Sequence, residues 1–244
     1  MKSRSLFIFL ISISLCTIVN AQVSKPVFSF KENSGSHNTH IASDGEYYYT
    51  VNGGRSENGR INKFNLKGEL ISGYDFKLDM RSIMYSTKDK NLYINCYDDN
   101  NLYKIINLET GIYEVMYKNV YINDQASLTL GTKGKFLYSF NKGDLDIYKF
   151  STGKRIKTLT GFNCGEGFMG GDAVAAVDSK YIYTWGVYKK TVYIYTLKGK
   201  EVKTVELSDG NYGSSLSYAN GYIFVSVDGN NNVGTWYAYD LWAK

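Results

Sequence analysis

The sequence predicts an all-β protein that folds as a five-bladed β-propeller, and its composition and an internal repeat support this prediction. The chain holds 23 Tyr, 12 Phe and 24 Gly against one Pro. Aromatic residues favour strands, and glycine favours turns. A pair of aliphatic or aromatic residues recurs five times, and its second members are 45, 45, 45 and 41 residues apart. That period matches a propeller blade of about 40 to 50 residues. The pairs are Tyr47-Tyr48, Leu92-Tyr93, Leu137-Tyr138, Ile182-Tyr183 and Ile223-Phe224.

Each repeat unit contains the elements of a four-stranded antiparallel meander. A first strand of small residues suits the crowded centre of a propeller. The aromatic pair marks a second strand, an alternating segment such as residues 145–148 a third, and segments such as 155–159 and 201–207 a fourth. Turns rich in Gly, Asp and Lys separate the strands, as expected for hairpins. The predicted first strands are Ile41 to Ser43, Ser82 to Ser86, Ala126 to Leu130, Ala173 to Val177 and Ser214 to Tyr218.

The last unit lacks a fourth strand, which predicts how the ring closes. Its third strand is expected over 235–241, and only three residues follow. Residues 26–31 alternate, precede the first unit and have no other partner in the pattern. We therefore expect this N-terminal strand to complete the last blade, which would protect sheet edges and hold both termini. A solenoid is the alternative, and it would need polar caps at both ends instead.

Residues 1–21 are predicted to be a signal peptide. Lys2 and Arg4 precede an apolar stretch over 6–19, and Val19-Asn20-Ala21 fits a cleavage site. The stretch is short for a membrane span of about 20 residues. A lipid anchor on Cys16 is the alternative, although Leu15 stands where a small residue is wanted. The mature chain, residues 22–244, is thus expected to be a single secreted or periplasmic domain without membrane insertion.

The charge of the mature chain argues against nucleic acid as a partner. Removal of Lys2 and Arg4 leaves 26 basic residues against 23 acidic ones, a net charge of about +3. The basic residues are scattered, and no run of five or six occurs. Nucleic-acid binding is therefore not expected.

The blades resemble those of the broad class of repeat propellers that carry an Asp-Gly turn before an aromatic second strand. Residues 43–49, Ser-Asp-Gly-Glu-Tyr-Tyr-Tyr, carry this resemblance, which extends at blade level over residues 26–244. The Trp-Asp dipeptide of the commonest propeller repeat is absent from the sequence. Exported bacterial propellers of this class often bind sugars or proteins, so the resemblance implies a scaffold and no particular activity.

The expected function is non-enzymatic: an exported binding or scaffold propeller that recognises a glycan, a peptide or a protein partner. The loops before each first strand and after each second strand share one face, called here the loop face, where ligands are expected. The Gly-rich loop over 161–171 is the longest irregular segment on it. No cofactor and no metal are expected. The candidate ligand-binding residues are His37, His40, Arg55, Arg81, Glu166, Phe168, Asp172, Trp185, Tyr188 and Tyr212.

The sequence leaves several other readings open. One is a hydrolase or lyase whose acid and base lie around Asp172, Arg81 and His40. Another is a zinc site that combines His37 and His40 with Cys96 and Cys164, whose thiols could instead form a disulfide. The Asp/Asn-rich loops over 98–101 and 228–232 could hold calcium or simply form turns. In the long loop, Phe162 and Phe168 could pack beneath the chain as a small core of their own.

Overall fold

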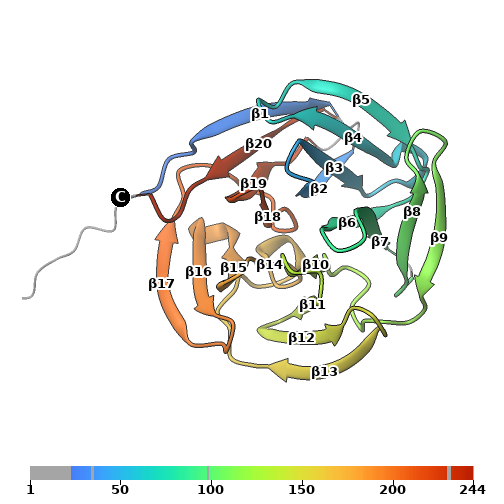
Figure 1. Cartoon of the computed structure of the whole chain (residues 1–244). Helices are drawn as coiled ribbons and strands as arrows, with labels where there is room; N and C mark the ends of the chain where they lie inside the picture. The colour runs from blue at the N-terminus through green and yellow to red at the C-terminus, as the bar shows by residue number, and fades with distance from the viewer. Residues whose placement is uncertain (1–22, 34–35, 98, 230–231, 244) are drawn as a thin grey trace, which may run out of the picture.

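The structure is a computed structural model of the chain that describes residues 23–33, 36–97, 99–229 and 232–243. The predicted signal peptide, residues 1–21, lies outside the described residues. The described chain forms five four-stranded antiparallel sheets arranged in a ring (Figure 1). It is a five-bladed β-propeller. Among the described residues, no helix has the length and apolar character needed to cross a membrane.

The five blades follow the chain in order. Blade 1 is β2 (His37–Ser43), β3 (Tyr47–Gly53), β4 (Arg60–Asn65) and β5 (Leu70–Asp75). Blade 2 is β6 (Met80–Ser86), β7 (Asn91–Cys96), β8 (Leu102–Asn107) and β9 (Ile112–Tyr117). Blade 3 is β10 (Thr129–Leu130), β11 (Phe136–Asn141), β12 (Asp144–Lys149) and β13 (Lys154–Leu159). Blade 4 is β14 (Ala175–Val177), β15 (Tyr181–Gly186), β16 (Thr191–Thr196) and β17 (Glu201–Glu206). Blade 5 is β18 (Ser217–Ala219), β19 (Tyr222–Val227), β20 (Val233–Tyr239) and β1 (Phe28–Asn33).

Three of the inner strands are shorter than the sequence predicts, and in blades 3 and 4 this is because part of the backbone bonds across blades. β10 covers only the end of the predicted 126–130, and β14 and β18 begin later than predicted. Ser127 forms an isolated parallel bridge with Val174 of blade 4, and its N–H donates to Ala173 O at 3.0 Å. This backbone therefore joins neighbouring blades instead of lengthening the ladder within one blade.

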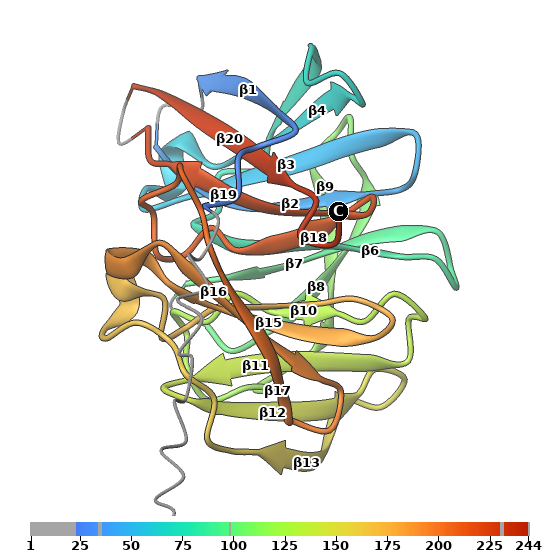
Figure 2. The ribbon, with the colours of Figure 1, turned by 90° about the vertical axis from the view of Figure 1, so that its left-hand side faces the viewer.

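The predicted ring closure is confirmed. β1 pairs antiparallel with β20 over six residues, from Phe28↔Ala238 to Asn33↔Val233, and the two strands lie side by side in Figure 2. The carboxylate of Glu32 is buried and accepts hydrogen bonds from Trp236 Nε1 and Asn62 Nδ2, both at 2.6 Å, and from the hydroxyl of Thr50. Glu32 thus ties β1 to both blade 5 and blade 1.

The C-terminal tail adds a contact between blades 5 and 4 that the sequence did not predict. Trp242 stacks on Tyr181 at 4.4 Å between ring centroids, and its Nε1 donates to Tyr183 O–H at 3.2 Å. Lys203 of β17 donates from Nζ to Leu241 O at 2.7 Å. These side chains stabilise the interface between blades 4 and 5, in addition to the strand pairing that closes the ring.

Candidate functional site

Side chains on the inner strands hydrogen-bond to the neighbouring blades around the channel. An inner strand has one unpaired edge, and buried carbonyls on that edge need donors. Hydroxyls supply them, which gives the Ser- and Thr-rich inner strands a structural role. The bonds run from Thr39 Oγ1 to Met80 O (3.1 Å), from Ser127 Oγ to Arg81 O (2.9 Å) and from Thr129 Oγ1 to Ala175 O (2.9 Å). Ser226 of the second strand β19 makes a similar bond, from its Oγ to Asn38 O (3.2 Å).

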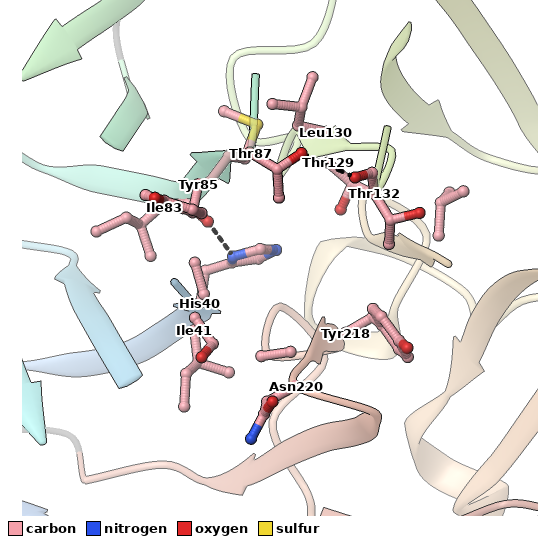
Figure 3. Close-up of a pocket in the computed structure, with 15 residues that line it drawn as sticks. His40, Ile41, Ile83, Tyr85, Thr87, Thr129, Leu130, Thr132, Tyr218 and Asn220 are labelled. Carbon is pink, nitrogen blue, oxygen red and sulfur yellow. Dashed lines mark hydrogen bonds between the residues drawn. The ribbon is translucent and has the colours of Figure 1, made fainter. Parts of the chain in front are cut away.

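The channel contains a cavity of about 120 Å³ at the end where the first strands finish (Figure 3). This end carries the turns between first and second strands and is called here the turn face, opposite the loop face. Among the described residues, no Asp, Glu, Lys or Arg lines the cavity. The polar lining residues are His40, Ser43, Tyr85, Thr87, Thr129, Thr132, Tyr218 and Asn220.

His40 is the buried polar side chain at the centre of this cavity. It is 3% exposed, and its Nδ1 lies 2.9 Å from Ile83 O. Because a carbonyl only accepts, Nδ1 carries the proton and Nε2 of the neutral ring presents a lone pair. Nε2 is buried without a hydrogen-bond partner in the described chain, and the ring points in among the lining side chains in Figure 3. Burial lowers the pKa of His40 to about 4, although the bond to Ile83 O opposes the shift.

His40 should make the protein less stable in mild acid. The unfolded chain binds this proton near pH 6.5 and the folded chain only near pH 4. The contribution of neutral His40 to the free energy of unfolding is therefore fully present above about pH 6.5. It is lost as the pH drops toward 4, by about 3 kcal/mol in all. We expect urea midpoints at pH 7.5 and 4.5 to differ more for the wild type than for His40→Asn, which retains a donor for Ile83 O. Equal differences in the two proteins would show that His40 is not buried as a neutral ring.

Arg81 anchors a second polar cluster, at the loop face. Its side chain is 6% exposed, and its guanidinium lies 3.3 Å from the carboxylate of Asp79. The rings of Tyr97 and Phe168 flank the guanidinium, with centroids 4.9 and 5.6 Å from Cζ. The cation is therefore already paired and largely covered by aromatic rings.

His37 belongs to the same end of the channel. Its Nδ1 lies 2.7 Å from Asp228 Oδ2, and its ring stacks on Tyr212 at 5.6 Å. Gly54, at φ +95°, leaves room for this ring, because a Cβ there would collide with it. The structure thus brings four of the predicted residues, His37, Arg81, Phe168 and Tyr212, to one end of the channel.

The remaining predicted residues are dispersed. Arg55 is exposed in the loop after β3. Glu166 and Tyr188 line a hollow of about 190 Å³ beside Cys164. Trp185 corrects the prediction of a ligand-facing ring: it is fully buried and packs in the core shared by blades 4 and 5, because its strand turns this face inward. Asp172 is 6% exposed, and burial raises the pKa of its carboxyl, against the opposing charge of Lys142.

The acid–base grouping of the enzyme reading does not form one site. His40 lines the cavity at the turn face, and neither Arg81 nor Asp172 lines that cavity. The two histidines also have different hydrogen-bond partners: His37 bonds to Asp228 and His40 to Ile83. The hypothetical catalytic grouping therefore has no geometric support.

The positions of Cys96 and Cys164 test the zinc-site and disulfide alternatives. Cys96 and Cys164 are both free thiols, and burial raises the pKa of each. Within the described residues, no three His, Cys, Asp or Glu side chains come together in a metal-binding group. Asp98, Asn230 and Asn231 of the two Asp/Asn-rich loops lie outside the described residues. The small core expected beneath the long loop is not formed as predicted: Phe162 joins the core between blades 3 and 4, beside Phe140 and Tyr195, whereas Phe168 lies against Arg81.

The comparisons with known proteins agree with the fold. No protein-family model matches the sequence, and no curated protein does. The structure is similar to glutaminyl cyclase of Myxococcus xanthus, with a TM-score of 0.61 and 9% identity, over 89% of this chain and 97% of that one. The shared property is the propeller fold.

Two other solved structures show lower similarity. Hydrazine synthase of Kuenenia stuttgartiensis has a TM-score of 0.44 and 13% identity over 81% of this chain and 82% of that chain. Apo AztD of Citrobacter koseri has a TM-score of 0.40 and 9% identity over 72% of this propeller and 48% of that chain.

Sequence reasoning missed most of the lining of the turn-face cavity. Thr87, Thr132, Tyr218 and Asn220 were expected only to end strands or form turns. The available signal was positional: each follows or ends a predicted first strand, so all four belong to one end of the channel. The expectation that ligands bind at loops drew attention to the opposite face.

Proposed function

We propose that this propeller is a non-catalytic binding protein that takes a neutral, hydroxyl-bearing group, such as the end of a glycan, into the turn-face cavity. The observation that carries the proposal is the buried, unpartnered Nε2 of His40. A buried acceptor without a donor costs about 1–3 kcal/mol, and a ligand O–H would remove that cost. Binding at the loop face stays a separate prediction.

The lining favours an uncharged ligand. Burying an unpaired charge is far more costly than burying a hydroxyl that is hydrogen-bonded, and no ionised side chain lines this cavity to pair with one. Ile83, Leu130 and Val177 supply apolar wall, while Ser and Thr hydroxyls can exchange hydrogen bonds with ligand hydroxyls. A volume of about 120 Å³ holds several waters and suits one end of a sugar rather than a whole oligosaccharide.

The test is a panel of neutral oligosaccharides, screened with residues 22–244 and followed by calorimetry on the sugars that bind. His40→Asn keeps a donor near Nδ1 and removes Nε2, so we expect affinity to fall about tenfold or more. His40→Gln places an amide oxygen near the position of Nε2 and should bind better than His40→Asn. Unchanged affinity in His40→Asn, or no binding by any sugar of the panel, would overturn the proposal.

A further inference from the structure

Two surface grooves lie on either side of the turn over 131–135, and one of them adjoins the turn-face cavity. One lies between blades 2 and 3 and has a volume of about 410 Å³; the other lies between blades 3 and 4, with about 180 Å³. The two grooves share Lys135 and Phe136. The second also shares Thr132 with the channel cavity. A ligand that enters the channel can therefore continue onto this surface.

The grooves carry more positive than negative charge. Four lysines line them, together with two aspartates, Asp89 and Asp178. The lysines are exposed, and none forms an ion pair within the described chain. The four are Lys88, Lys133, Lys135 and Lys149.

Both aspartates are engaged in their own turns. Asp89 accepts a hydrogen bond from the Tyr93 hydroxyl. Asp178 accepts one from the Tyr183 hydroxyl at 2.7 Å and two from backbone N–H groups of its turn, each at 2.6 Å. These bonds hold both carboxylates within their own turns, and neither carboxylate forms an ion pair with a groove lysine in the described chain.

The groove between blades 2 and 3 also has an apolar surface. Phe136 is 39% exposed and Ile156 is 54% exposed, and Met116 and Tyr117 are half-buried beside them. Aromatic and aliphatic surface of this kind can pack on the C–H faces of sugar rings, while ammonium groups attract carboxylates.

We propose that the ligand of this propeller is an acidic glycan, whose neutral end occupies the channel and whose carboxylates lie over the lysines beside the turn over 131–135. This inference rests on the proposed function and specifies its ligand class. A nucleic acid fits less well, because its backbone carries a phosphate at every nucleotide and the channel offers none of them a cation.

A matched pair of probes tests the charge requirement: a hyaluronan hexasaccharide, which has a neutral N-acetylglucosamine at one end and carboxylates along the chain, and its fully methyl-esterified form, which has the same chain without the ionised carboxylates. We expect the acidic hexasaccharide to bind the wild type at least about tenfold more tightly than its methyl ester, with an affinity that falls as salt is raised. In the double variant Lys133→Gln/Lys135→Gln, this advantage of the acidic probe should be lost. Lys67→Gln/Lys77→Gln, which removes two exposed lysines of blade 1 that line neither groove, should retain it.

The outcomes separate this inference from the proposed function. Equal binding of both probes that is lost in His40→Asn would support the channel and overturn the acidic ligand. Acidic-probe binding that depends on Lys133 and Lys135 but not on His40 would support the lysine surface and overturn binding in the channel. If both double lysine variants lost the tighter binding of the acidic probe equally, or if a single-stranded oligodeoxynucleotide bound equally tightly, the binding would be nonspecific charge attraction. Either result would overturn the inference. Binding of neither probe overturns it as well.

Discussion

Deletion of residues 22–32 is expected to destabilise the propeller by several kcal/mol, a large part of the 5–15 kcal/mol typical of a folded domain. The deletion removes almost all of β1, so β20 loses the partner that it pairs with over six residues. It also removes Glu32, leaving the buried donors of Trp236 and Asn62 without their acceptor. Thermal and urea unfolding of the truncated chain measure the effect.

A point substitution separates the carboxylate from the strand. Glu32→Gln keeps β1 but replaces one carboxylate oxygen with an NH2 group, which cannot accept, so either Trp236 Nε1 or Asn62 Nδ2 loses its acceptor. We expect a loss of about 1–3 kcal/mol, less than the deletion. A truncated chain with the wild-type melting temperature would show that β1 does not close the ring.

Ala175→Lys is expected to cost about 3–5 kcal/mol, as an uncompensated buried charge does. Ala175 is 2% exposed and lies in the core cluster that blade 4 shares with Tyr138 and Phe140 of blade 3. Its neighbour Ala176 packs on the other side, in the cluster that includes Leu216 of blade 5. Both alanines therefore face other blades, and the lysine has no route to solvent through the channel.

Ile122→Lys is the matched control. Ile122 is 72% exposed, so the same new charge should stay within about 0.5 kcal/mol of wild type. Asn231, another polar-loop position suited to such a control, lies outside the described residues. Equal urea midpoints for Ala175→Lys and Ile122→Lys would mean that β14 is not an inner strand between two packed blades.

The candidate sites at the two ends of the channel differ in what they offer a ligand. At the loop face, Arg81 is paired with Asp79 and His37 with Asp228, so the strongest groups there already have protein partners. At the turn face, the central acceptor, Nε2 of His40, has none within the described chain. A free, buried acceptor beside a cavity is the better basis for a binding hypothesis, and this difference directs the experiments to the turn face.

The architecture could be predicted from the amino-acid sequence. The repeat of aromatic pairs predicted five blades, and the orphan strand before the first unit predicted the closure between β1 and β20. These features follow from local chemistry: alternation along a strand and Gly or Asp in a turn depend on neighbours in the chain. Because this strand and turn pattern recurs about every 45 residues, it can be recognised in the sequence without a structure.

The contacts between polar residues could not be predicted, because they depend on how the blades pack. His37 and His40 are three residues apart in one strand, yet the first bonds to Asp228 of blade 5 and the second to Ile83 of blade 2. Likewise, Trp185 and Tyr188 are close in sequence, but one is fully buried and the other is 76% exposed. In a propeller, a side chain on an inner strand acquires its partners from other blades, about one repeat or more away. Periodicity along the chain fixes where each strand lies, whereas the packing of blades around the ring decides which side chains become hydrogen-bonded, buried or left facing the channel.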